Sequence, residues 1–195
     1  MQIHESQIPK PNSTQVLIKV MVSGSNPKDW KGPTPIPAQN NTNTGDDIAG
    51  IIEAVDSSVV EFGPGDRVAR LHKLKTLHGS YAEYALGEEY STIMLPENVN
   101  FEEGATIPLA AMTAAIGLFN SLALPEPWCQ HEILREQVKG GAEVYGATSA
   151  VGSFAIKLLR KADIHPIIAV AGKGISYVEG LIERNKGDVI IDYRE

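Results

Sequence analysis

The fold is decided by one stretch of sequence, AEVYGATSAVG at residues 142–152, which runs directly into the apolar-periodic segment Phe154–Leu159. This order is typical of a strand, a turn of small residues and a helix. A helix N-terminus offers unpaired backbone N–H groups and a partial positive charge, and small turn residues let a pyrophosphate approach them closely. We therefore predict a phosphate cradle and a bound dinucleotide.

The sequence around this cradle supplies the context that such a site needs. Gly146 would allow the tight turn and Gly152 the close packing of helix on strand, while Ser149 stands where a middle glycine is common. The pattern then continues with a strand at 166–170, a helix at about 175–183 and a strand at 189–191. This order predicts one βαβαβ half of a doubly wound parallel sheet. The alternative is an ordinary strand–helix turn without a ligand.

The residues at the end of the next strand bear on the choice of cofactor. An acidic side chain about 20 residues beyond the turn would hold the ribose 2′-hydroxyl of NAD. Here the sequence is Ala171-Gly172-Lys173, with no carboxylate and a lysine instead. A lysine can accept a 2′-phosphate, so we expect NADP(H) rather than NAD(H). The alternative is that Lys173 is only a solvated loop lysine.

The first part of the chain is mostly β in pattern. Strands are predicted at 15–22, 48–55, 80–86 and 91–95, with a further short strand after the turn at 62–68. Asn100 and Glu103 have the spacing of a helix-capping box, and apolar residues from Leu109 to Leu122 recur at helical spacing. Pro125 and Pro127 end that helix, so we place the domain boundary between residues 124 and 125.

Composition excludes several classes of function. With 195 residues, 43% of them hydrophobic, the chain can bury a core, while its net charge of −7 argues against nucleic acid as a partner. No run of 18 apolar residues and no signal peptide is present, and Cys129 is the only cysteine, so we expect no disulfide, no membrane association and a cytoplasmic location.

A third segment, SGSNPKDWK at 23–31, follows directly on the first predicted strand. Together with four later motifs it resembles the zinc-free branch of the medium-chain dehydrogenase/reductase superfamily, most closely fungal quinone oxidoreductase-like proteins and trans-acting enoyl reductases. Those motifs are GDDIAG at 45–50, PGDRV at 64–68, GSYAEY at 79–84 and the cradle. The resemblance implies a GroES-like domain in residues 1–124 and an NADP(H)-binding Rossmann domain, incomplete, in residues 125–195.

The resemblance also implies where the cofactor and substrate would bind. The nicotinamide end would meet Asn26, Pro27, Lys28 and Asp29; the pyrophosphate would meet Gly146, Thr148, Ser149, Ala150, Val151 and Gly152; the adenosine end would meet Ala171, Gly172, Lys173, Gly174 and Tyr193. An acyl substrate would meet Met112 and Thr113. Without the resemblance, Lys28 and Asp29 are a solvated loop pair, Met112 and Thr113 are core residues, and Tyr81 and Tyr84 are ambiguous.

No metal site is expected. A catalytic zinc needs about three protein ligands, and the five histidines, His4, His72, His78, His131 and His165, lack ligand spacing, which favours surface or structural roles. Reduction of a conjugated carbonyl needs no metal, because hydrogen-bond donors such as Lys28, Thr113 or a backbone N–H can stabilise the charge that develops on the oxygen.

The resulting expectation is an NADPH-dependent reductase of an enoyl thioester, enone or quinone, with an acyl chain carried by a synthase as one form of substrate. The chain stops at Glu195, just after the third strand of a half sheet whose edge full-length proteins cover. We therefore expect a fragment, a truncated gene model, or a chain whose sheet is completed by a partner, for example by self-association. The alternative function is a non-catalytic or degenerate cofactor-binding form.

Overall fold

The computed structural model describes residues 3, 5–31, 45–74, 76–128 and 140–195. Cys129, His4 and His131, which entered the predictions above, lie outside the described residues. The chain forms two compact units, Met1–Leu109 and Ala110–Glu195. Each unit has its own sheet and is described by itself.

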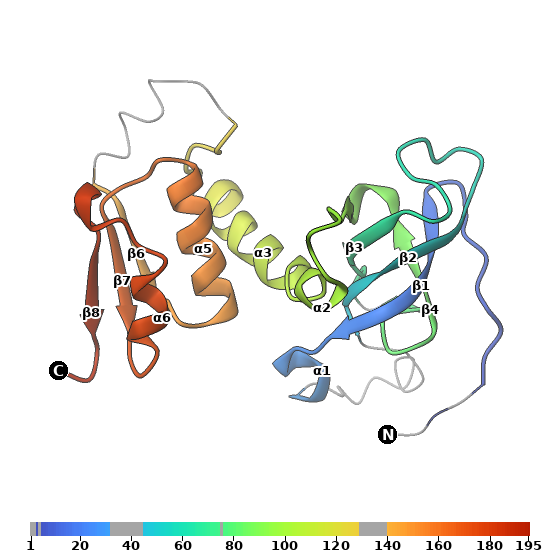
Figure 1. Cartoon of the computed structure of the whole chain (residues 1–195), viewed down its shortest axis with the longest axis horizontal. Coiled ribbons are helices and arrows are strands. Elements are labelled where there is room, and N and C mark those ends of the chain that lie inside the picture. Colours follow the sequence, from blue (N-terminus) through green and yellow to red (C-terminus); the bar gives the residue numbers. More distant parts are fainter. Residues whose placement is uncertain (1–2, 4, 32–44, 75, 129–139) are drawn as a thin grey trace. The chain divides into compact units, whose positions relative to one another are not determined.

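The first unit is built on a five-stranded antiparallel sheet (Figure 1). Its strands are β1 (Gln15–Gly24), β2 (Asp47–Val55), β3 (Arg67–Leu71), β4 (Tyr84–Glu88) and β5 (Thr92–Met94), in the spatial order β4-β1-β2-β3-β5. The fully buried side chains of Val16, Ile18, Ile48 and Val68 form much of its core. These β-branched residues fit the pleated, buried surface of a sheet, which explains why the sequence pattern identified the strands.

Two short α-helices lie within the described residues of this unit. Helix α1 (Pro27–Lys31) follows β1 after a short turn, and α2 (Phe101–Gly104) packs against β1, β2 and β3. The predicted capping box at α2 is confirmed, because the Asn100 side chain accepts from the Glu103 amide at 2.7 Å and the Glu103 carboxylate accepts from the Asn100 amide at 3.1 Å. Where strands were predicted at 80–86 and 91–95, residues 80–83 form bends and Glu89–Ser91 (η2) a 3₁₀ turn, so both strands are shorter.

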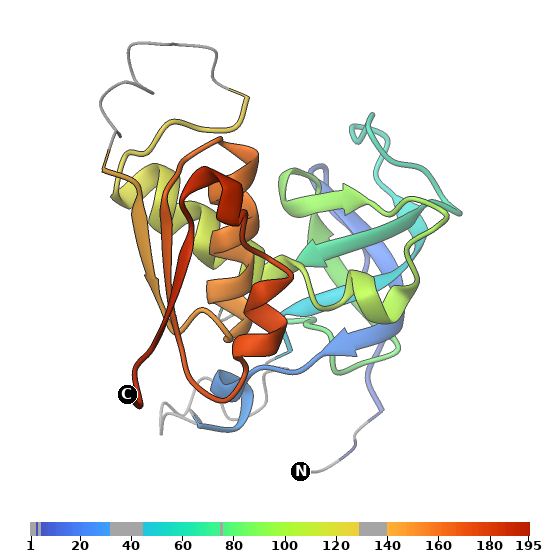
Figure 2. The same ribbon diagram turned by 60° about the vertical axis from the view of Figure 1, so that its left-hand side comes forward.

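The second unit has a three-stranded parallel sheet in the order β6-β7-β8, with α5 and α6 packed against it (Figure 2). The elements are β6 (Ala142–Tyr145), α5 (Ala150–Lys161), β7 (Ile167–Ala171), α6 (Ile175–Glu179), η4 (Arg184–Lys186, 3₁₀) and β8 (Val189–Asp192). The predicted βαβαβ order and the α/β fold class, an antiparallel β domain followed by three strands of a parallel sheet with helices, are confirmed. The second helix ends at Glu179, earlier than predicted, with Gly180 as its C-cap.

The division between the units falls within helix α3 (Pro108–Ala115), which continues as a π-helical segment, η3 (Ile116–Ser121). The sequence placed the boundary at 124/125, after this helix. The difference has a packing reason, because Ala114 and Leu118 are buried in the core of the second unit together with Val144 and Ile156. The helix therefore belongs mainly with the sheet that follows it.

One helical run passes simple tests for a membrane span. Among the described residues, Phe101–Ser121 has the necessary length and a mean hydropathy of 1.2, with 33% of the tested window buried. It is divided into α2, α3 and η3, and Ala105, Ala114 and Leu118 within it are buried in the protein cores.

Candidate functional site

The turn between β6 and α5 has the backbone that the sequence predicts. Gly146 has a φ of 77°, a conformation that L side chains rarely adopt. The backbone amides of Gly146 and Ala147 both donate to the Val170 carbonyl, at 3.1 and 3.0 Å, which ties the turn to the end of β7. Ser149 caps α5, its hydroxyl accepting from the Gly152 amide at 3.0 Å.

The cradle leaves two amides of the first helical turn without an acceptor. No described residue accepts from the backbone N–H of Ala150 or of Val151, while the Gly152 amide is satisfied by Ser149. Gly152 has no room for a side chain, since an added Cβ would lie 2.3 Å from the Gly146 carbonyl oxygen. Together these features make an anion-accepting helix terminus on a closely packed turn.

The carboxyl end of β7 brings the other predicted residues of this unit beside the cradle. A Cβ on Gly174 would lie 2.6 Å from the Thr148 side chain, and a Cβ on Gly172 would lie 2.6 Å from the Tyr193 hydroxyl. The Tyr193 ring also lies 6.3 Å from the ring of Tyr145. The two turns, 146–149 and 172–174, therefore meet through Thr148, with Tyr193 against the second turn.

The charged side chains at this edge of the sheet are an exposed lysine and a carboxylate that is paired with an arginine. Lys173 is exposed, and residues 171–174 contain no carboxylate. Asp192, which pairs with Ala171 at the end of β8, is bound by Arg194, whose Nε donates to it at 2.8 Å. The hydrogen bonds from Arg194 lower the pKa of Asp192 to about 2. The nearby carboxylate is therefore already paired with a cation.

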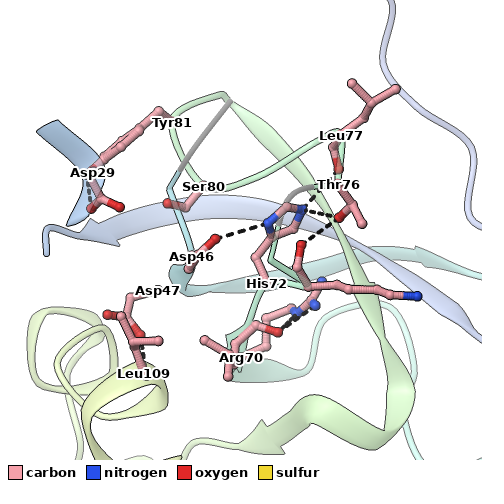
Figure 3. A network of polar contacts seen from close by, with 12 residues as sticks. Asp29, Asp46, Asp47, Arg70, His72, Thr76, Leu77, Ser80, Tyr81 and Leu109 are labelled. Atoms are coloured by element: carbon pink, nitrogen blue, oxygen red, sulfur yellow. Dashed lines mark hydrogen bonds and ion pairs between the residues drawn. The ribbon is translucent and has the colours of Figure 1, made fainter. Parts of the chain in front are cut away.

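The first unit contains a second group of predicted residues, at the turn between β1 and α1. Pro27 is the first residue of α1, and the Asn26 amide donates to Asp29 Oδ2 at 2.8 Å. The Asp29 side chain is only 5% exposed and lies beside Tyr81, whose hydroxyl donates to it at 2.8 Å (Figure 3). The alternative in which Asp29 is part of a solvated loop pair is therefore wrong.

Lys28 is held by two carboxylates. Its Nζ lies 2.9 Å from Asp29 Oδ1 and forms a second ion pair with Asp46 Oδ2, while 39% of the side chain stays exposed. Burial alone would lower the pKa of Lys28, but the hydrogen bonds and charges of Asp46 and Asp29 raise it above its ordinary value. Lys28 is therefore a fixed ammonium with an accessible surface.

Two carboxylates of this network, Asp29 and Asp47, differ in their environment. For Asp29, burial is outweighed by the hydrogen bonds from the Asn26 amide, Lys28 and Tyr81, which lower its pKa. For Asp47, burial dominates and raises the pKa, although Asn26 Nδ2 and the Leu109 amide both donate to it at 2.7 Å. Burial and the bond to Asp29 also raise the pKa of Tyr81.

Sequence reasoning missed the buried part of this network, Asp46, Asp47, Arg70 and His72. Asp46 and Asp47 were quoted only as part of a family motif, although two acidic residues at the start of a buried strand are a signal of a polar site. Arg70 is 1% exposed and donates to the carbonyls of Leu71 and Leu86, and burial lowers its pKa to about 10. For His72, a surface position is wrong, because it is 3% exposed.

Two further predictions concern the substrate-binding residues on α3 and a metal site. Met112 and Thr113 lie on α3 and are exposed, with 43% exposure for Met112, so a role as core residues is wrong for both. Within the described ranges, no three His, Cys, Asp or Glu side chains come together as a metal-binding group. His165 is structural, since its Nδ1 lies 2.7 Å from the buried Asp188.

Comparisons with known proteins agree with this architecture. Residues 12–97 match the family model of the alcohol dehydrogenase GroES-like domain. The whole chain is 46% identical to a trans-enoyl reductase of Gibberella fujikuroi, of which it covers 57%. Over 193 residues, 96% of this chain, it is 33% identical to a quinone oxidoreductase of Sus scrofa, of which it covers 53%. The chain thus spans about half the length of these relatives.

Solved structures show the same fold. An alcohol dehydrogenase superfamily protein from Novosphingobium aromaticivorans matches 98% of this chain with a TM-score of 0.78 and 27% identity, over 55% of that protein. A mycobacterial protein solved in complex with NADPH matches 97% of this chain, over 53% of its own length, with a TM-score of 0.66. At 20% identity, that second likeness is one of fold alone.

Proposed function

Because this chain belongs to the quinone oxidoreductase and trans-enoyl reductase branch of the medium-chain dehydrogenase/reductase superfamily, we propose that it binds NADP(H) and reduces a conjugated acceptor without a metal. The acceptor class is an enoyl thioester, an enone or a quinone. The observation that carries the proposal is the cradle, in which two free amides at the start of α5 meet a turn too tight for a Cβ at Gly152.

The residues of the second unit fit a dinucleotide phosphate. The amides of Ala150 and Val151 would hold the pyrophosphate, helped by the positive end of the α5 dipole. Lys173 follows the end of β7 and is exposed, whereas Arg194, after the neighbouring strand β8, is paired with Asp192, so Lys173 is the cation that would meet a 2′-phosphate. This supports NADP(H) over NAD(H). Tyr193 offers an exposed ring beside the same turn.

The first unit supplies a hydrogen-bond donor for the reaction itself. A bound nicotinamide supplies the hydride. Addition of hydride to the far carbon of a conjugated system leaves negative charge on the carbonyl oxygen, which a fixed donor stabilises. We assign that role to the Lys28 ammonium, which Asp29 and Asp46 hold in place. Thr113, on α3 in the second unit, is the other candidate donor that the sequence indicates. Met112 would contribute apolar surface to an acyl pocket.

The relatives support one form of the substrate. Trans-enoyl reductases are among the relatives of this chain, so an acyl chain attached to a synthase is the acceptor we favour. The second candidate function is cofactor binding without turnover. Both candidate functions require NADP(H) binding, so only a measurement of turnover distinguishes them.

The test measures oxidation of NADPH by the purified chain with enoyl thioesters, enones and quinones. We expect turnover with at least one class, and a roughly 100-fold lower kcat for Lys28→Met, by analogy with loss of one oxyanion donor. Lys19→Met, an exposed lysine on β1, is the matched control and should behave as wild type. Binding of NADPH without turnover by any acceptor would establish the non-catalytic alternative.

A further inference from the structure

We propose that Asp47 is a positioning residue, which orients the side-chain amide of Asn26 so that its oxygen, Oδ1, accepts a hydrogen bond from the nicotinamide half of the cofactor. This role rests on the proposed function, because Asn26 directly precedes α1, the helix that carries Lys28. In that function the nicotinamide lies against the acceptor whose oxygen meets Lys28, so its half of the cofactor comes close to this turn.

Asp47 is a buried carboxylate that forms no ion pair within the described ranges. The residue is 4% exposed, and burial raises its pKa, as do the charges of Asp46 and Asp29. Burying a carboxylate without a cation costs stability. A group of this kind is more typical of a functional site than of a core.

The two oxygens of Asp47 face N–H donors from two different segments. The Leu109 amide donates to Oδ1 at 2.7 Å (Figure 3). The side-chain nitrogen of Asn26, Nδ2, donates to Oδ2, also at 2.7 Å. Gly24, the partner of Asp47 between β1 and β2, leaves room for this side chain, because an added Cβ would lie 2.6 Å from Asp47 Cβ. The carboxylate therefore has a fixed position.

This carboxylate determines which end of the Asn26 amide is available to a ligand. An ionised carboxylate only accepts hydrogen bonds, so the amide nitrogen of Asn26 faces Asp47. The backbone of Asn26 is fixed as well, because its amide donates to Asp29 Oδ2 at 2.8 Å and its carbonyl accepts from the Asp29 amide at 3.0 Å. In the described part of the chain no group donates to Asn26 Oδ1, and the residue is half-buried. This oxygen is therefore an acceptor that a ligand can use, two positions before Lys28.

A nicotinamide nucleoside has two kinds of donor for such an oxygen, the NH₂ of its carboxamide and the hydroxyls of its ribose. If the Asn26 amide were turned over, its own NH₂ would face the cofactor, and two N–H donors cannot bond to each other. By fixing one orientation of the amide, Asp47 makes the turn complementary to a donor on the cofactor.

Asp47→Asn tests the positioning. The new side chain has one oxygen instead of two, and when the Leu109 amide takes it, an NH₂ group faces Asn26, whose amide must turn over. We expect NADPH to bind about tenfold more weakly, the loss of one hydrogen bond, in calorimetric titrations at neutral pH. Binding of adenosine 2′,5′-bisphosphate, which lacks the nicotinamide nucleoside, should be unchanged. Glu53→Gln, which removes an exposed carboxylate from the same strand, is the matched control and should bind both ligands as wild type.

A third ligand, 2′-phospho-ADP-ribose, distinguishes the two kinds of donor. It keeps the ribose of the nicotinamide nucleoside but lacks the carboxamide. A loss in Asp47→Asn for NADPH alone would identify the carboxamide as the donor, whereas a loss for NADPH and 2′-phospho-ADP-ribose would identify the ribose. Both results support the role of Asp47.

Double variants show whether Asp47 acts through Asn26. Asn26→Ala removes the acceptor, so NADPH should bind about tenfold more weakly, and adding Asp47→Asn should weaken binding no further. Exchanging the pair, Asn26→Asp with Asp47→Asn, again places an N–H donor against a carboxylate and leaves one oxygen for the cofactor. Its affinity should return to within about threefold of wild type. If Asp47→Asn does not fold alone, the exchanged pair and Asn26→Ala decide, because the exchange keeps an acceptor for the Leu109 amide.

Three results would overturn this role: wild-type affinity for NADPH in Asp47→Asn, an equal loss for all three ligands, or an exchanged pair that binds as weakly as Asn26→Ala. A wild-type chain that binds none of the ligands would overturn the proposed function and the role of Asp47 with it. The two failures are distinguishable, because only the second is seen in the wild-type chain.

Discussion

Asp29 is held as an anion by a backbone amide, an ammonium and a phenol. The donors are the Asn26 amide at 2.8 Å, Lys28 Nζ at 2.9 Å and the Tyr81 hydroxyl at 2.8 Å. Because these bonds lower the pKa of Asp29, its contribution to stability is present above the pKa of the unfolded chain. It is lost as the pH falls through the lower pKa of the folded protein.

Tyr81→Phe tests this residue. Removing the phenol should lower the free energy of unfolding by about 1 kcal/mol at pH 7, and the difference from wild type should shrink at an acidic pH below the lowered pKa of Asp29. Urea denaturation at the two pH values measures both effects. Tyr84→Phe is the matched control, because no described residue bonds to the Tyr84 hydroxyl. Equal losses in both variants, or a loss independent of pH, would contradict this role.

The side-chain contacts that the sequence could not predict join residues that are far apart in the chain. Tyr81 and Asp29 are 52 residues apart, and His72 and Asp46 are 26 apart. A local pattern therefore shows a lysine next to an aspartate, and a lone histidine, without the partners that bury them. The motif resemblance identified Asn26, Lys28 and Asp29 as a group, but it did not indicate that Asp46 and His72 extend it.

At the scale of elements, the cradle was predictable because its interactions are local. Gly146, Ser149 and Gly152 lie within seven positions of each other, and small-residue chemistry specifies the turn directly. The lengths of α3 and α6 were less predictable. The apolar period of 109–122 does not distinguish an α-helix from the π-helical turn at Ile116–Ser121, and Gly180 ends α6 early.

Gly152→Ala tests the packing of α5 on the turn. The added methyl would lie 2.3 Å from the Gly146 carbonyl oxygen, so the helix start must shift, at a cost of about 1–3 kcal/mol. Chemical denaturation of the second unit measures it. Gly117→Ala is the control, because its Cβ would meet no heavy atom within 4 Å. If both variants were as stable as wild type, the close approach at Gly152 would be refuted.

At the scale of the whole molecule, each of the two units carries one part of the proposed function. The β content of the first unit was predictable from runs of β-branched residues between turns, and the parallel sheet of the second unit from the βαβαβ order. The boundary was not, because Pro125 and Pro127 mark the end of the helix, whereas burial of Ala114 and Leu118 assigns α3 mainly to the second core.

The central claim is that the turn at 146–152 binds the phosphates of NADP(H), and thermal unfolding with added cofactor tests it most directly. At a concentration 100 times the Kd, bound NADPH would stabilise the folded state by about 2.7 kcal/mol and raise the Tm by several degrees. We predict a larger rise with NADPH than with NADH at equal concentration. An unchanged Tm at saturating NADPH would contradict the account.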